Sequence, residues 1–161
     1  MKKKAKRIAR MMANVSLKVL ADMIVDEYKG IRYEVYSDGS CKDGCGGCGW
    51  LVLHSGALVN SGRATYKSTN SIEIEIRSVI HALSDCPFSC HVDVYLDCQA
   101  AIRIITKQRL RPILKAEYDK ASKGKEIRFH WVRSHHGNIY NEMADSLAYY
   151  AAKGKNKGLK C

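Results

Sequence analysis

The stretch Tyr33-Glu34-Val35-Tyr36-Ser37-Asp38-Gly39-Ser40 decides the fold, because it alternates aromatic, β-branched and polar residues before it reaches an acidic Asp-Gly-Ser sequence. Such a run predicts a strand, and the absence of proline favours a central place in a sheet. We expect Asp38 to leave the sheet at the carboxyl end of this strand, where Gly39 permits a close backbone approach. Asp-Gly-Ser alone is also typical of a simple turn, so the interpretation depends on whether other carboxylates converge on this point.

Composition and charge describe a soluble globular domain with two basic ends. The chain has 161 residues, of which 46% are hydrophobic and 27% charged. No apolar run approaches the roughly 20 residues of a membrane span, so we expect no membrane insertion. Residues 1–30 carry eight Lys and Arg against three acids, and residues 153–161 carry four against none, within a formal charge of +11. This pattern indicates basic arms that bind nucleic acid, or else solubilising tails.

The cysteines and the basic start bear on location. Seven cysteines without an export signal predict reduced thiols and a cytoplasmic protein. Mitochondrial import is an alternative, because residues 1–21 hold no acidic residue. Cys45-Gly-Gly-Cys48 has the spacing of half a zinc site, but no second close pair follows. We therefore interpret residues 41–48 as a glycine-rich turn.

Hydrophobic periodicity predicts the other elements. An amphipathic helix with a basic head is expected over residues 5–28. Short-linked strands at 49–54 and 57–66 should follow the first strand as antiparallel neighbours. The alternation at 72–76 also fits a strand, but its apolar residues continue on one helical face to Leu83. The remaining predictions are helices at about 72–83, 99–107, 112–121 and 141–152, and strands at 91–97 and 127–132.

Several carboxylates are candidates for one site. Asp97 ends the strand at 91–97 much as Asp38 ends the first strand, and parallel strands place their carboxyl ends at the same edge of a sheet. Two adjacent carboxylates repel each other unless a cation lies between them, and an all-oxygen set suits Mg²⁺ or Mn²⁺. Glu73 and Glu75 flank the apolar stripe of their helix equally, so periodicity does not choose between them. Asp145 borders the buried stripe of the last helix.

Five motifs in order resemble type 1 ribonuclease H. They are Tyr36-Ser37-Asp38-Gly39-Ser40, Thr69-Asn70 with Glu75 to Leu83, Tyr95-Leu96-Asp97-Cys98-Gln99, Trp131-Val132-Arg133-Ser134-His135, and Asn141 to Ala148. The resemblance covers residues 31–152. It implies an α/β ribonuclease H-like fold, a five-stranded mixed sheet of three antiparallel and then two parallel strands, flanked by helices. The expected domains are a basic N-terminal helical extension (1–30), the ribonuclease H domain (31–152) and a basic tail (153–161).

The resemblance also implies roles for single residues. It selects Glu75 over Glu73, because Glu75 stands eight residues before Leu83, which is the spacing of the family's motif. The implied metal-binding and catalytic carboxylates are Asp38, Glu75, Asp97 and Asp145, and His135 is the catalytic histidine beside them. The implied substrate-binding residues are Gly39, Ser40, Cys41, Thr69, Asn70, Gln99, Arg133 and Asn141.

The implied activity is endonucleolytic hydrolysis of the RNA strand of an RNA/DNA hybrid with two Mg²⁺ ions, or Mn²⁺, leaving 3′-hydroxyl and 5′-phosphate ends. The expected partner is the hybrid, and the protein is expected to be a monomer. Two alternatives stay open: an inactive nucleic-acid-binding module of the same fold, and a ribonuclease H domain of a retroelement polyprotein.

The sequence departs from the family in the middle and at the N-terminus. Between Asp97 and Trp131 there is room for two helices, but not for the extra basic helix with which many bacterial members hold the hybrid. The candidates for a substitute are Lys107, Arg109, Arg111 and the two termini. The helix expected at 5–28 has no family counterpart.

Overall fold

The computed structural model describes residues 30–68 and 70–154. The helix predicted for 5–28, Thr69 and residues 155–161 of the basic tail lie outside the described residues. The described elements, in chain order, are β1 (Arg32–Lys42), β2 (Cys45–His54), β3 (Ala57–Lys67), α3 (Ser71–Ser84), β4 (His91–Leu96), α4 (Gln99–Thr106), α5 (Pro112–Ser122), β5 (Glu126–Trp131) and α6 (Ile139–Lys153).

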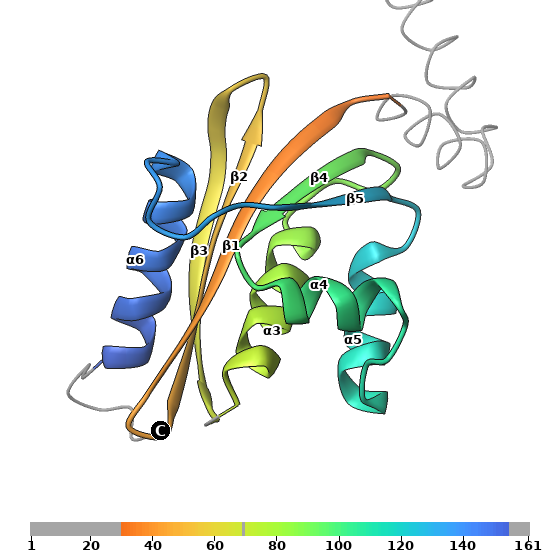
Figure 1. The fold of residues 1–161 in the computed structure, drawn as a ribbon. Coiled ribbons are helices and arrows are strands. Elements are labelled where there is room, and N and C mark those ends of the chain that lie inside the picture. The colour runs from red at the N-terminus through yellow and green to blue at the C-terminus, as the bar shows by residue number, and fades with distance from the viewer. Residues whose placement is uncertain (1–29, 69, 155–161) are drawn as a thin grey trace, which may run out of the picture.

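The strands form one mixed sheet with the order β3-β2-β1-β4-β5 (Figure 1). The first three strands are antiparallel hairpin neighbours, whereas β4 runs parallel to both β1 and β5. This arrangement confirms the predicted five-stranded sheet and the central place of β1. None of the helices that the structure describes is long and apolar enough to span a membrane.

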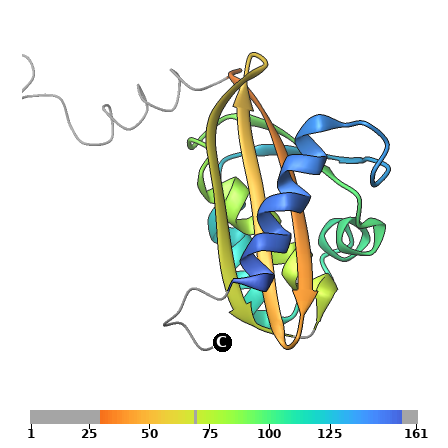
Figure 2. The same cartoon turned by 90° about the vertical axis from the view of Figure 1, so that its left-hand side faces the viewer.

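Helices cover the sheet in two layers. The helices α3, α4 and α5 lie on one face, and α6 lies on the other across β1, β2 and β3 (Figures 1 and 2). Because successive side chains of a strand point to opposite faces, Val35 joins the larger core beneath α3, while Tyr36 joins a smaller core beneath α6. Both Val35 and Tyr36 are buried.

The glycine-rich turn predicted for residues 41–48 is wrong for most of its length. The Cys45–Cys48 segment belongs to β2 and pairs with β1, which leaves only Asp43 and Gly44 as the turn. A Cβ at Gly47 would collide with the backbone of α6 at Ala148 and Ala152, so this glycine serves helix packing. The clustered glycines therefore reflect close packing on both faces of the sheet, and not a turn.

Candidate metal and active site

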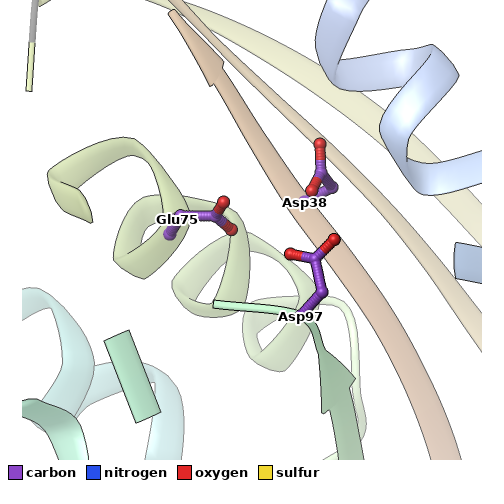
Figure 3. A group of neighbouring side chains, drawn as sticks. All are labelled: Asp38, Glu75 and Asp97. Carbon is purple, nitrogen blue, oxygen red and sulfur yellow. The ribbon is translucent and has the colours of Figure 1, made fainter. Parts of the chain in front are cut away.

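The strand register places Asp38 beside Asp97. β1 and β4 pair in parallel up to Tyr36 and Tyr95, and β4 ends one residue later. Asp38 and Asp97 each lie two residues beyond this last pair. The two aspartates therefore meet where β4 ends (Figure 3). The expectation that Asp38 itself leaves the sheet is wrong, because β1 continues to Lys42 and Asp38 still pairs with Gly49 of β2. What ends at this point is the pairing with β4.

Glu75 reaches the same point from the first half of α3. The Asn70 side chain caps this helix by accepting a hydrogen bond from the Glu73 amide. A Cβ at Gly39 would lie 2.6 Å from the Glu75 backbone nitrogen, so only glycine lets β1 pass this close to α3. The close approach brings the Glu75 carboxylate against those of the two aspartates (Figure 3).

The three carboxylates form a tight, largely buried cluster. Each offers one oxygen, and these oxygens all lie within 4.8 Å of one another. Asp38 is 6% exposed and Glu75 7%, while Asp97 is half-buried. Burial, followed by the charges of Asp97 and Asp145, raises the pKa of Asp38 to about 7. Burial and the neighbouring Asp38 likewise raise the pKa of Glu75 well above its usual range.

This cluster fits a hard divalent cation. Repelling carboxylates in a buried place are costly, and a cation between them removes that cost. The Glu75 Oε2 atom is buried and has no hydrogen-bond partner among the described residues, so a ligand atom is available. Oxygen ligands alone suit Mg²⁺ or Mn²⁺ rather than Zn²⁺. No other group of three or more His, Cys, Asp or Glu side chains in the described ranges is placed to hold a metal.

A comparison with known protein families shows to which family the chain belongs. A family profile of RNase H matches residues 31–153, most of the chain.

The chain belongs to the RNase H family.

Relatives and solved structures agree with this assignment. The chain is 34% identical over 131 residues to a ribonuclease H of Cupriavidus metallidurans, covering 71% of this chain and 90% of that protein. It is 35% identical over 144 residues to one of Paracidovorax citrulli, covering 78% and 95%. The crystal structure of LC9-RNase H1, a type 1 RNase H with the type 2 active-site motif, is 27% identical and superposes with a TM-score of 0.66 over 78% of this chain and 74% of that one. The enzyme is thus a ribonuclease H, a family that acts on RNA/DNA hybrids.

Two hydrogen bonds that sequence reasoning missed hold Asp97 in this enzyme. The Ser134 hydroxyl donates to Asp97 Oδ2 at 2.6 Å, and Trp131 Nε1 donates to the Asp97 carbonyl oxygen at 3.0 Å. Both residues belong to the Trp131–His135 motif, but their spacing gives no sign that they bond back to Asp97. The strand β5 beside β4 brings them there.

Asp145 and His135 stand at the edge of the cluster. Asp145 is half-buried on α6 and contributes to the raised pKa of Asp38, yet its carboxylate is not among those within 4.8 Å of one another. His135 is exposed on the loop between β5 and α6, with a φ of 52°. The N–H of Gly137 in that loop donates to Glu142 Oε1 at 3.2 Å, which ties the loop to α6.

The predicted substrate-binding residues differ in exposure. Gly39, Ser40 and Cys41 follow Asp38 on β1 and are half-buried, and Asn141 is buried at 3% exposure. Asn70, Gln99 and Arg133 are exposed, and Thr69 lies outside the described residues. Asn70 lines one hollow together with Arg109 and Arg111, two of the candidates for the missing basic helix.

Glu73, the alternative to Glu75, serves another purpose. Its carboxylate accepts from Arg77 Nε at 3.1 Å and lies 3.9 Å from Arg111 Nη1, away from the cluster. Glu73 therefore joins α3 to the residue that precedes α5.

The cysteines form no metal site among the described residues. Cys41, Cys48, Cys86, Cys90 and Cys98 carry free thiols, as predicted, whereas Cys45 is disulfide-bonded, so the prediction of reduced thiols is wrong there. The Cys48 thiol donates to the Ile74 carbonyl oxygen, and burial raises its pKa, so it remains a protonated core residue.

Proposed function

We propose that this ribonuclease H hydrolyses the RNA strand of RNA/DNA hybrids endonucleolytically, with two Mg²⁺ ions held by Asp38, Glu75, Asp97 and Asp145. The observation that carries the proposal is the cluster of three carboxylates, in which one Glu75 oxygen has no hydrogen-bond partner among the described residues. Bound there, the ions would supply activation of water and stabilisation of the leaving oxygen in an in-line phosphodiester displacement. The expected products carry 3′-hydroxyl and 5′-phosphate ends. Mn²⁺ has the same ligand preference and is the alternative ion.

The residues of the chain prepare the site before substrate arrives. Ser134 fixes one carboxylate oxygen of Asp97, and Gly39 fixes the distance between β1 and α3. The raised pKa of Asp38 means that its carboxyl group tends to hold a proton until a cation replaces it. His135, on an exposed loop, is proposed to assist protonation of the leaving group or product release.

Recognition of RNA requires contacts to 2′-hydroxyl groups, which the minor groove of the hybrid displays. We assign these contacts to Gly39, Ser40, Cys41, Asn70 and Gln99. Thr69 would hold a phosphate of the DNA strand, and Arg133 and Asn141 complete the substrate-binding set. Because Asn70, Arg109 and Arg111 line one hollow, this place suits the second strand of the hybrid.

We also propose how the chain is organised. Residues 31–152 form the catalytic domain, and the basic residues of 1–30 and 153–161 add phosphate contacts. We propose a monomeric, cytoplasmic enzyme.

The test is a panel of end-labelled duplexes of one sequence, as RNA/DNA, RNA/RNA, DNA/DNA and single-stranded RNA, incubated with Mg²⁺ or with EDTA. Only the RNA strand of RNA/DNA should be cut, only with Mg²⁺, and the fragments should carry 3′-hydroxyl ends. Binding of the hybrid in Mg²⁺ without any cleavage would instead favour an inactive binding module. Cleavage in EDTA would contradict metal-dependent chemistry.

A further inference from the structure

A second cluster of side chains lies on the same two elements that carry Asp38 and Asp145. Lys42, the last residue of β1, places its Nζ 5.8 Å from the centre of the Tyr149 ring of α6. Lys153, the last residue of α6, places its Nζ 5.3 Å from the same ring. Tyr150 meets Tyr149 edge to face, with ring centres 5.6 Å apart. We name these four residues the lysine-tyrosine cluster.

The cluster is exposed and positively charged. Tyr149 is 39% exposed and Tyr150 60%, so both residues are accessible to a ligand. A hydrogen bond with Lys153 and the charges of both lysines lower the pKa of Tyr149. In the part of the chain that the structure describes, no acidic side chain pairs with Lys42 or Lys153.

Two rows of side chains lead from the carboxylates to this cluster. On β1, Asp38, Ser40 and Lys42 point to one face of the sheet, because strand side chains alternate. On α6, Asp145, Tyr149 and Lys153 recur every four residues and so share one face of the helix. Each row is about 12 to 13 Å long. Figures 1 and 2 show β1 and α6 running toward the same end of the molecule.

The part of α6 that carries the cluster packs closely on the sheet. A Cβ at Gly47 or Gly49 of β2 would collide with the α6 backbone, so α6 lies directly on the sheet. The Thr65 hydroxyl of β3 also donates to the Ala151 carbonyl oxygen at 3.1 Å, near the end of the helix. A closely packed backbone keeps the loss of backbone entropy on binding small, so the cost that remains is the ordering of the exposed side chains.

We propose that the lysine-tyrosine cluster is a second nucleic-acid subsite, which holds the strand that continues from the metal site. Lysine ammonium groups bind phosphates, and exposed tyrosine rings stack on bases. A row of about 12 Å corresponds to about three to four nucleotides of one strand. That a nucleic-acid strand continues from the metal site to this cluster rests on the proposed function. The bound strand is either a continuation of the duplex or an unpaired extension. Both offer phosphates to the lysines and bases to the tyrosines.

The test is the salt dependence of binding, measured by fluorescence anisotropy between about 50 and 200 mM salt. Full-length protein with Asp97→Asn is used so that the substrate stays intact. The ligands are a short blunt hybrid that fills only the metal site, a longer hybrid, and the short hybrid with a single-stranded extension. The variant Lys42→Ala/Lys153→Ala is compared with Lys120→Ala/Lys123→Ala, which removes the same charge from exposed positions at the end of α5.

The lysine pair should matter only for the ligands that reach it. Its loss should reduce the log-log salt slope by about 1.8 for the longer hybrid, or by about 1.4 for the single-stranded extension. The control variant and the blunt short hybrid should show no such change. Tyr149→Ala should weaken binding of the extended ligand about tenfold, while Tyr149→Phe should keep it.

An unchanged slope in the lysine variant, or one equal to that of the control, would overturn the subsite. Equal competition by polyglutamate and by single-stranded DNA of the same length would overturn it in favour of an acidic protein segment. Failure of the wild-type chain to cut hybrids would contradict the proposed function instead, and it is read from a separate cleavage assay.

Discussion

Gly39→Ala should disable the enzyme without unfolding it. The added Cβ would lie 2.6 Å from the Glu75 nitrogen and 2.9 Å from its Cα, against about 3.4 Å for an ordinary contact, so β1 and α3 must separate by about 0.8 Å. Overpacking of this kind costs about 1 to 3 kcal/mol, partly offset by about 0.4 to 1 kcal/mol from the lower entropy of the unfolded chain. The net cost is at most about 2.6 kcal/mol, so the melting temperature should fall by no more than about 10 °C. Because a displacement of about 1 Å costs catalysis up to about a hundredfold, kcat should fall by about 10- to 100-fold.

Gly62→Ala provides the matched control. A Cβ there would collide with the Trp50 ring, in the same sheet but two strands away from β1 and not against α3 at Glu75. We expect a similar loss of melting temperature and nearly unchanged hybrid cleavage. Thermal melting and single-turnover cleavage are measured for both variants at saturating enzyme. If Gly39→Ala melts like Gly62→Ala and still cleaves within about twofold of wild type, close packing of β1 on α3 does not set the geometry of the site.

Three further predictions follow from the same contacts. Ser134→Ala should lower Mg²⁺ affinity about tenfold, as seen in a Mg²⁺ titration of the melting temperature, because the Asp97 carboxylate loses the hydroxyl that orients it; an unchanged titration would contradict this role. Glu75→Gln should abolish cleavage while Glu73→Gln keeps it, since Glu73 bonds to arginines outside the cluster; the reverse result would show that the wrong glutamate was chosen. The free energy of unfolding in EDTA should fall as pH rises from about 4 to 7, because the folded state retains a proton on Asp38 that the unfolded state releases; urea titrations of Asp38→Asn should show a smaller fall, and an equal fall in both proteins would exclude this cause.

The sequence was enough to predict most of the fold and the meeting of two aspartates. Alternation in β1 and the crossover between parallel strands place Asp38 beside Asp97 before any coordinates are known. The choice of Glu75 required the family frame, because two glutamates flank the apolar stripe of α3 alike. Burial then separates them in the structure: Glu75 lies against β1, and Glu73 faces the arginines.

What the sequence could not show depends on distances between distant segments. The glycines of β2 resemble a turn, yet they serve the packing of α6, which periodicity in a single strand does not reveal. The bond from Ser134 to Asp97 spans 37 positions and arises only because β5 lies beside β4. The contact of Lys42 with Tyr149 likewise depends on how α6 lies across the sheet.

We expect Asp97, together with Asp38 and Glu75, to bind the metal that cleavage needs. The most direct test is single-turnover cleavage of a labelled RNA/DNA hybrid across a Mg²⁺ titration, for wild type, Asp97→Asn and Asp93→Asn. Asp93 is a matched control: it lies four residues earlier on β4 and binds Arg32 and His130 instead. We predict that Asp97→Asn loses more than about a hundredfold in rate at every Mg²⁺ concentration, while Asp93→Asn keeps its Mg²⁺ dependence. Cleavage by Asp97→Asn within a few-fold of wild type would show that Asp97 does not bind the catalytic metal.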